Sequence, residues 1–167
     1  RPGVVGITLE EMQAATGALL ESGASIDVIN TIRKHLSRVK GGRLAEAMQP
    51  ARSVNLIVSD VVGDRLDTIA SGLTVPDTTR FADALRYVEQ FALEERIPES
   101  VTARLRSGAR GEVPETPKPG SPAFAGVENI LLGTNYHGLR AAMDEARRRG
   151  YGVLPLTSQL VGEAREV

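Results

Sequence analysis

The sequence predicts an α/β fold, and three observations carry that prediction. Residues 54–58 form a short aliphatic, β-branched run that is typical of a buried strand. The segments on either side of this run repeat apolar residues at helical spacing. Residues 127–156 then read as strand, helix and strand, which predicts parallel strands joined by a right-handed crossover. Three predicted strands are few for such a sheet, so we expect a partial domain.

The first helix is predicted to begin after Thr8 and to end at Gly23. Thr8 and Glu11 have the spacing of a capping box, in which each side chain caps the backbone of the other. A glycine that follows the last apolar residue is a common helix end. The face expected to point toward the core comprises Leu9, Met12, Ala15, Leu19 and Leu20.

A second helix is predicted to begin after Ser25, with Asp27 favourably placed near its positive end. Gly41 and Gly42 interrupt the helical pattern, and residues 43–48 are predicted to form a short further helix. The expected core-facing residues of the second helix are Ile26, Ile29, Ile32 and Leu36. The same spacing puts Asn30, Lys34 and Arg38 on its other side.

Residues 59–78 are rich in Gly, Ser, Thr, Asp and Pro and lack periodicity, which predicts a loop. Because this loop is longer than most connections, it favours a functional role. Helices are expected at 79–93 and 99–107. The Pro- and Gly-rich residues 108–126 suit either a disordered linker or an extended segment that crosses a domain surface. The last unit is predicted as strand 127–132, turn 133–135, helix 136–149 and strand 151–156.

The composition excludes several classes of protein. The 167 residues are 41% hydrophobic and 25% charged, as in an ordinary globular domain with a core. A net charge of −1 without a strongly basic block gives no reason to expect nucleic acid as a partner. The absence of cysteine excludes disulfides, thiolate zinc sites and a cysteine nucleophile. No apolar run approaches the roughly 20 residues that cross a membrane, so we expect a cytoplasmic protein.

The two ends of the sequence predict an internal fragment of a longer protein. The chain begins at Arg1 and not at methionine. Its last residues, 158–167, read as a helix that lacks a stop signal such as Gly or Pro.

Two carboxylates, Asp60 and Asp64, follow the predicted strand 54–58 directly. In α/β proteins, ligands bind in the crevice beyond the carboxyl ends of the strands. A carboxylate in that place can accept a proton from a substrate hydroxyl or bind Mg²⁺. Because the loop is long, we favour a functional role over the alternative of solvated turn-forming aspartates.

Other polar clusters are ambiguous when taken alone. The cations of residues 33–43, together with Gly41 and Gly42, suit phosphate oxygens, but helix C-terminal capping explains the same pattern and is favoured. Ser71, Gly72 and Thr74 suit turn chemistry as well as a pocket lining. Asn135 is more simply a helix cap than an anion ligand. Neither a Walker motif nor a GxGxxG fingerprint after a strand is present.

Four stretches together resemble the type II glycerate kinase family, whose members often carry a C-terminal MOFRL domain. They occur in family order and span nearly the whole chain. Two departures are Leu73 and Val62, where the family usually has proline; both leave Asp60 and Asp64 intact. The four stretches are INTIRKHLSRVKGGRLA (29–45), SDVVGDRLDTIASGLTVPD (59–77), ETPK (115–118) and NYHGLRAA (135–142).

The resemblance implies a Rossmann-like, three-layer larger domain with a mainly parallel sheet, a smaller second domain and an active site in the cleft between them. Residues 1–167 would form part of the larger domain, with the N-terminal segment and the MOFRL domain outside this chain. The implied activity is ATP-dependent phosphorylation of D-glycerate to 2-phospho-D-glycerate with Mg²⁺. The implied partner is a small molecule, with no nucleic acid and no membrane, and a homodimer is left open.

The resemblance also implies roles for individual residues. The implied catalytic residues are Asp60 and Lys34, and the implied Mg²⁺ ligands are Asp60 and Asp64. Which of the two acids is the base stays open. The implied ATP-binding residues are Lys40, Gly41, Gly42 and Arg43. The implied substrate-binding residues are His35, Ser71, Gly72, Thr74 and Asn135.

Three other functions stay in competition with the kinase. Some relatives carry the label of hydroxypyruvate reductase, although a reductase needs a nicotinamide site and no fingerprint for one is present. A catalytically silent module that binds a nucleotide or a sugar acid is a second alternative, and a purely structural α/β domain is a third. Assays with ATP plus D-glycerate and with NADH plus hydroxypyruvate separate the two enzymes.

Overall fold

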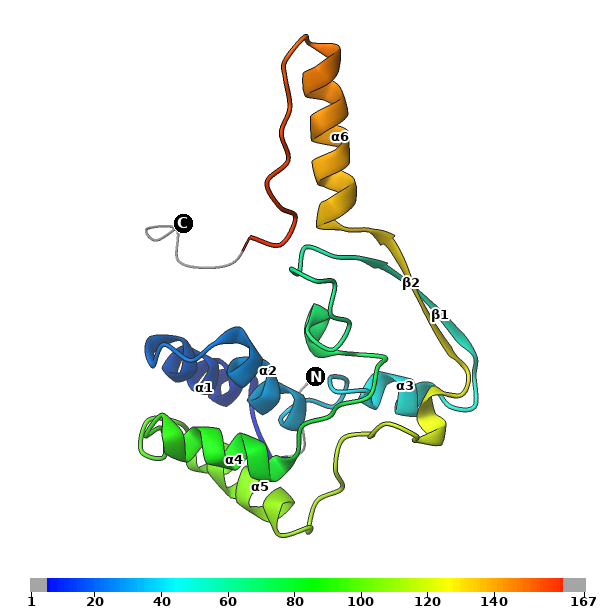
Figure 1. Cartoon of the computed structure of the whole chain (residues 1–167). Coiled ribbons are helices and arrows are strands. Elements are labelled where there is room, and N and C mark those ends of the chain that lie inside the picture. Colours follow the sequence, from blue (N-terminus) through cyan, green and yellow to red (C-terminus); the bar gives the residue numbers. More distant parts are fainter. Residues whose placement is uncertain (1–5, 161–167) are drawn as a thin grey trace.

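A computed structural model describes residues 6–160 and shows a mixed α/β architecture (Figure 1). A layer of helices lies on one side of the molecule, the sheet lies beside it, and the helix nearest the C-terminus projects away from both. Along the chain, the elements are α1 (Leu9–Glu21), α2 (Ile26–His35), α3 (Arg43–Met48), β1 (Ser53–Val58), η1 (Ile69–Ser71), α4 (Phe81–Gln90), α5 (Glu99–Ala109), η2 (Pro122–Phe124), β2 (Val127–Gly133) and α6 (Asn135–Arg148).

The start of α1 follows directly from its local sequence. The Glu11 N–H donates to Thr8 Oγ1 at 3.2 Å, and the Thr8 N–H donates to Glu11 Oε2 at 2.7 Å, so the predicted capping box is confirmed. The apolar face was predicted only in part. Ala15 and Leu19 are buried, whereas Leu9 and Leu20 are 56% and 63% exposed.

The hydrophobic core lies between α1, α2, α4 and α5. These helices pack as two pairs, and α2 also contacts the 3₁₀ turn η1. Phe81 is fully buried at the start of α4, where its ring meets the edge of His35. The largest fully buried apolar side chains of this cluster are Leu19, Ile32, Phe81, Val88, Leu93, Val101 and Leu105.

Helix α2 is buried on more sides than its sequence suggests. Ile29 and Ile32 face the core as predicted, but Ile26 is 57% exposed. Asn30 and Lys34 were expected on the side away from the core, yet they are only 6% and 4% exposed. The reason is that the loop between β1 and α4 folds back over this side of the helix, where it supplies polar partners to both residues.

The sheet consists of two parallel strands in the described part of the chain. β1 pairs with β2 from Ser53 opposite Val127 to Val58 opposite Gly133, with an irregularity between Ile57 and Val58. The α/β class and the parallel sheet are therefore confirmed, but the pair observed is 53–58 with 127–133 and not the predicted pair of 127–132 with 151–156. The prediction that residues 54–58 are buried was wrong for one face, because Val54, Leu56 and Val58 are 61%, 64% and 75% exposed.

The third predicted strand, residues 151–156, is not formed. This segment runs back along α6 as irregular chain and does not lie beside β1 or β2 (Figure 1). A strand needs a neighbour to pair its backbone N–H and C=O groups, and the aliphatic pattern alone does not supply one. Leu154 and Leu156 are accordingly 82% and 89% exposed. The helix predicted over 158–167 extends beyond the described residues, and within residues 6–160 no helix could span a membrane.

Candidate active-site cleft

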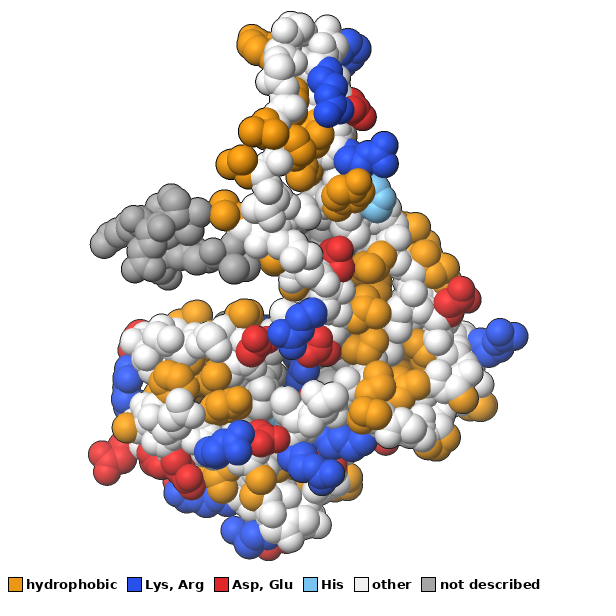
Figure 2. Space-filling model, in the orientation of Figure 1, with side chains coloured by type: hydrophobic (Ala, Val, Ile, Leu, Met, Phe, Trp, Pro, Cys, Tyr) orange, Lys and Arg blue, Asp and Glu red, His pale blue; other side chains and the backbone are white. Residues whose placement is uncertain are grey.

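A cleft of about 720 Å³ opens between α2 and the loop that follows β1. Figure 2 shows acidic and basic side chains gathered in the middle of the molecule, where the helical layer meets the rest of the chain. Residues of both signs line the cleft, so it is charged but close to neutral. Its lining residues are Ile26, Asp27, Asn30, Arg33, Lys40, Asp60, Val61, Val62, Arg65, Thr68, Ala70 and Ser71.

One wall of the cleft is a stripe along α2. Asp27, Asn30 and Arg33 follow one another at intervals of three residues, which puts them on one side of a helix. Asn30 is buried, and its Oδ1 accepts a hydrogen bond from Ser71 Oγ at 2.9 Å. Ser71 lies on the facing loop, so this bond joins the two walls at the base of the cleft.

Lys40 reaches the same place from beyond the end of α2. Its Nζ donates to the carbonyl oxygen of Ala70 at 2.9 Å and to Ser71 Oγ at 3.4 Å. Ala70 and Ser71 have φ angles of 50° and 60°, which side-chain-bearing residues rarely adopt. The lysine therefore supports a strained turn on which Ser71 is held toward Asn30.

Gly41 and Gly42 dock this turn through their backbone. The Gly41 N–H donates to the Ser71 carbonyl at 3.0 Å, and the Gly42 N–H donates to the Gly72 carbonyl at 2.7 Å. A Cβ on Gly42 would lie 2.8 Å from the carbonyl oxygen of Val75. Glycine is therefore needed at position 42 for the close approach of two chain segments. Both N–H groups that were expected to bind phosphate instead donate hydrogen bonds within the protein.

Arg43 lies outside the cleft lining and faces another part of the chain. Its guanidinium Nη2 donates to the Pro114 carbonyl at 3.0 Å. Burial lowers the pKa of Arg43, although nearby carboxylates oppose that change. The geometry gives this arginine a role in holding the 108–126 segment against α3, and it gives no contact with a ligand in the cleft.

Asp60 comes at the end of β1, as the sequence predicts, and its exposed side chain lines the cleft. The Asn135 side chain donates from Nδ2 to the Asp60 backbone carbonyl at 3.0 Å. Asn135 is the first residue of α6 and thus fixes the backbone of Asp60; its predecessor Thr134 is the N-cap residue.

Asp64 and Thr74 are placed apart from the cleft lining. Asp64 has a φ of 52°, and its Oδ1 is buried without a hydrogen-bond partner. Thr74 donates from Oγ1 to Asn129 Oδ1 at 2.6 Å beside the sheet. Neither side chain is among the cleft-lining residues.

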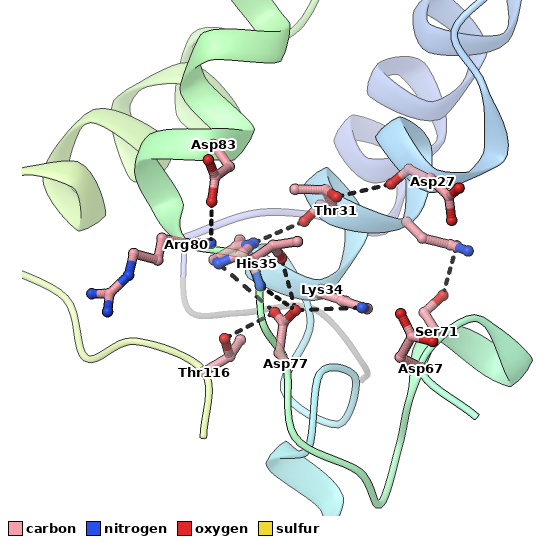
Figure 3. A network of polar contacts seen from close by, with 12 residues as sticks. Asp27, Thr31, Lys34, His35, Asp67, Ser71, Asp77, Arg80, Asp83 and Thr116 are labelled. Carbon is pink, nitrogen blue, oxygen red and sulfur yellow. Dashed lines mark hydrogen bonds and ion pairs between the residues drawn. The ribbon is translucent and has the colours of Figure 1, made fainter. Parts of the chain in front are cut away.

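Lys34 lies outside the cleft lining and is paired inside the protein. Its Nζ lies 3.3 Å from Asp77 Oδ1, and both side chains are buried. Figure 3 shows Lys34 and His35 reaching from α2 toward Asp77, with Thr116 on the other side of the carboxylate. Asp77 also accepts hydrogen bonds from the Thr79 N–H, from Thr79 Oγ1 and from Thr116 Oγ1.

The electrostatic balance at Asp77 favours its ionised form. Burial raises the pKa of this carboxyl, but the hydrogen bonds from Thr79 and the charge of Lys34 outweigh that effect. The net result is a pKa below the ordinary aspartate value. Lys34 and Asp77 therefore form a structural ion pair that ties α2 to the chain entering α4.

His35 is fully buried beside this pair. Its Nδ1–H donates to the Thr31 carbonyl at 2.8 Å, and its Nε2 lies 3.4 Å from Glu115 Oε2 and 3.9 Å from Asp77 Oδ2. Burial lowers the pKa of the imidazole, although both carboxylates act in the opposite direction. The ring lies in the core against Phe81, and the structure gives it no path to a ligand in the cleft.

Comparisons with known proteins identify the family of this chain. Residues 3–106 match a family model described as "Domain of unknown function (DUF4147)", which covers more than half of the chain. The chain belongs to this family. The chain is 46% identical over 161 residues to the "Glycerate 2-kinase" of Pyrococcus horikoshii and 45% identical over 161 residues to the "D-glycerate 2-kinase" of Thermotoga maritima. A "Putative hydroxypyruvate reductase" of Agrobacterium vitis is 44% identical over 161 residues.

Each of these alignments covers 96% of this chain but only 34–36% of the relative, so this DUF4147 chain spans about a third of the length of the curated relatives it matches. A crystal structure of a protein from Pyrococcus horikoshii OT3 matches with a TM-score of 0.75 at 46% identity, over 90% of this chain and 34% of that one. The crystal structure of glycerate kinase from Thermotoga maritima matches with a TM-score of 0.72 at 45% identity, over 90% and 33%. The resemblance inferred from the four sequence stretches is thus confirmed.

The structure brings three of the residues expected at the site into the cleft of this DUF4147 chain: Lys40, Asp60 and Ser71. The expected site residues outside its lining are Lys34, His35, Gly41, Gly42, Arg43, Asp64, Gly72, Thr74 and Asn135. Sequence reasoning missed Asn30 and Arg65 as lining residues, and it favoured helix capping for Arg33 and the other cations of residues 33–43. Asn30 and Arg33 share one helical stripe, which is the signal that could have found them.

The carboxylates of the cleft decide whether it could hold Mg²⁺. In the described residues, no group of three or more His, Asp or Glu side chains could hold a metal ion by itself. Kinase sites, however, commonly bind Mg²⁺ through one or two carboxylates plus the phosphates of the substrate. The exposed carboxylate of Asp60 on the cleft fits this second arrangement.

Proposed function

We propose that the full-length protein that contains this chain, meaning the complete product of its reading frame, transfers the γ-phosphoryl group of ATP to D-glycerate and forms 2-phospho-D-glycerate. The observation that carries this proposal is the shared cleft, which is lined by the carboxylate residue Asp60 together with Lys40 and Ser71. The names of the most similar relatives support the choice of D-glycerate.

Asp60 is the proposed reacting group of the protein. Phosphoryl transfer depends mainly on positioning and on charge neutralisation, with little covalent help from the enzyme. At the end of β1, this carboxylate can accept the proton of the glycerate hydroxyl or hold Mg²⁺ against the phosphates. When bound, Mg²⁺ would supply neutralisation of the charge on the phosphate oxygens.

Lys40 is the proposed positive charge beside the phosphate or the carboxylate. Its ammonium is held at Ala70 and Ser71, so it meets an anion without first losing much side-chain freedom. Burial lowers the pKa of Lys40, and the neighbouring charge of Arg33 lowers it further. An anion between these cations would relieve both effects.

The proposal also places this chain within the larger domain of the kinase, with a MOFRL domain elsewhere in the full-length protein. The relatives are about three times as long as this chain. The face of β1 that presents Val54, Leu56 and Val58 is apolar and exposed. Such a face is typical of a surface covered by another part of the protein.

A direct assay tests the function. The full-length protein is given ATP, Mg²⁺ and D-glycerate, and the products are identified by NMR. In a parallel assay it is given NADH and hydroxypyruvate, because one relative is named a putative reductase. Turnover with NADH alone would exclude the kinase, and turnover of neither pair would leave only a binding or structural role. Light scattering on the same sample tests whether the full-length protein is a homodimer.

Asp60→Asn tests the assigned role within the kinase. Loss of a general base lowers turnover by roughly 100- to 10,000-fold, and we expect kcat to fall within that range. The matched control is Asp144→Asn, which removes an exposed carboxylate of α6 that lies 3.2 Å from Arg147. Unchanged turnover in Asp60→Asn would refute the role of this residue.

A further inference from the structure

Arg33 is a cleft residue of the cationic run 33–43 that the family resemblance did not name as a site residue. It lies on α2 one turn after Asn30 and two turns after Asp27, and all three residues line the cleft. Its neighbour Lys34 does not line the cleft and is buried against Asp77. Two consecutive cations of the sequence thus have separate functions, because successive residues of a helix point about 100° apart.

Arg33 and Lys40 form a pair of like charges in the cleft. Lys40 Nζ is fixed by Ala70 and Ser71, and the charge of Arg33 is close enough to lower its pKa. Among residues 6–160, no ion pair joins either cation to a carboxylate.

Arg65 provides the contrast inside the same cleft. Its guanidinium lies 3.4 Å from Asp27 and 2.9 Å from Asp67, so its charge is compensated by two carboxylates. The cleft therefore contains one compensated cation and one uncompensated pair. Two adjacent positive charges without a counter-ion repel each other, and an anionic ligand between them converts that repulsion into binding energy.

We propose that Arg33 and Lys40 together bind an anionic oxygen group of the substrate, either the carboxylate of the acid or a phosphate of the nucleotide. The guanidinium supplies a planar pair of N–H donors that matches two oxygens of such a group, and the ammonium supplies a point charge beside it. Arg33 is thereby a specificity-determining residue, because an uncharged alcohol would leave both cations without a partner.

The position of Asp60 sets the direction of the bound molecule. A carboxylate repels an anion, so the anionic group binds toward Arg33 and Lys40 and a neutral hydroxyl lies toward Asp60. Ser71 lies on the cationic side, since its Oγ contacts both Lys40 and Asn30. This inference rests on the proposed function for the identity of the substrate, but the anion site itself can be tested without catalysis.

The test measures binding by calorimetry on the full-length protein, with D-glycerate alone and with inorganic pyrophosphate alone as probes. The variants are Arg33→Gln, Arg33→Lys and Lys40→Gln. Hydrogen bonds to charged groups are worth enough that each glutamine variant should weaken at least one probe roughly 10- to 100-fold. Arg33→Lys keeps the charge but loses the planar donors, so its loss should be smaller.

The matched control is Arg38→Gln, which removes one positive charge from an exposed residue just after α2 that does not line the cleft. Loss of D-glycerate binding alone assigns the pair to the carboxylate, and loss of pyrophosphate binding alone assigns it to phosphate. If the parent protein binds neither probe, or if Arg33→Gln and Lys40→Gln bind both as Arg38→Gln does, the inference is overturned.

Kinetics separate this inference from the proposed function. In an active kinase, Arg33→Gln should raise the KM for the substrate whose anion it binds more than it lowers kcat. If the full-length protein transfers no phosphoryl group, yet its anion binding falls in both glutamine variants, the proposed function fails and the anion site stands. If transfer occurs and the glutamine variants match the Arg38→Gln control, the proposed function stands and the anion site fails.

Discussion

Removing the Asp77 carboxylate tests whether its buried ion pair with Lys34 holds α2 against the chain that enters α4. Asp77 accepts hydrogen bonds from Lys34 Nζ at 3.3 Å, from the Thr79 N–H at 3.0 Å, from Thr79 Oγ1 at 2.7 Å and from Thr116 Oγ1 at 2.9 Å. Asp77→Ala leaves these donors unpaired and strands a lysine that is only 4% exposed. Breaking a buried pair in this way costs about 3–5 kcal/mol.

The reverse change, Lys34→Met, should cost less. The methionine fills the space of the lysine stem, and Asp77 keeps the three hydrogen bonds from Thr79 and Thr116. One lost hydrogen bond to a charged group is worth about 1.5–3 kcal/mol. In the double variant no charge is left unpaired, so its cost should fall below the sum of the two single costs by about 0.5–3 kcal/mol.

Hydrogen exchange read by mass spectrometry measures this coupling in the full-length protein through the amides of α2 and α4. The control cycle uses Glu21 and Arg96, an exposed pair at 2.9 Å in the same helical layer. Exposed pairs couple by about 0–1 kcal/mol. Additive costs at Lys34 and Asp77, within about 0.5 kcal/mol, would show that the ion pair does not hold these elements together.

The same pair predicts a pH dependence with a definite sign. The folded-state pKa of Asp77 lies below its ordinary value of 3.8, because the hydrogen bonds from Thr79 and the charge of Lys34 outweigh burial. Its contribution to stability is therefore present above the unfolded-state pKa and is lost as pH falls through the lower folded-state pKa. The parent protein should lose more protection in acid than Asp77→Ala, and equal losses would contradict this assignment.

Two glycine substitutions, Gly108→Ala and Gly42→Ala, test close packing by thermal unfolding, and Gly17→Ala is the control for both. Gly108→Ala gains about 1 kcal/mol of helix propensity. Its new Cβ would also overlap the buried ring of Phe81, and overpacking of this kind costs about 1–3 kcal/mol, so the variant should be destabilised overall. Gly17→Ala, a helical glycine with open space around it, should be stabilising, and the same sign for both would refute the packing argument. At Gly42 the φ is 82°, and an added Cβ would lie 2.8 Å from the Val75 carbonyl oxygen, so Gly42→Ala should lower the free energy of unfolding by at least about 2 kcal/mol. It should also speed hydrogen exchange at the amides of the Ser71 turn, and unchanged exchange there would contradict the docking of this turn on Gly41 and Gly42.

The predictions that succeeded depend on interactions between residues close in sequence. The capping box of Thr8 and Glu11 needs only three residues of separation, and it forms as expected. The break at Gly23 likewise depends on local backbone freedom. Helix α2, by contrast, ends at His35, before the predicted break at Gly41. The sequence also indicated that Asp60 follows a strand, which is enough to place it at a sheet edge.

The predictions that failed concern which part of the chain covers each face of a helix or strand. Spacing shows that Lys34 and Asn30 lie off the apolar stripe of α2, but it does not show that a loop 40 residues later covers them. Residues 151–156 have the composition of a strand but lie beside α6, where no sheet edge is available to them. Val54 has the character of a buried residue and lies on an open face.

The amino-acid sequence by itself determined the helices, the strand that precedes Asp60 and the family to which the chain belongs, because caps, periodicity and motifs are local patterns. Only the tertiary structure decided that Arg33 shares a cleft with Lys40 and that Lys34 does not. The physical reason is that a charged side chain takes its role from the groups it meets. For α2, those groups come from the loop after β1, which folding brings against it.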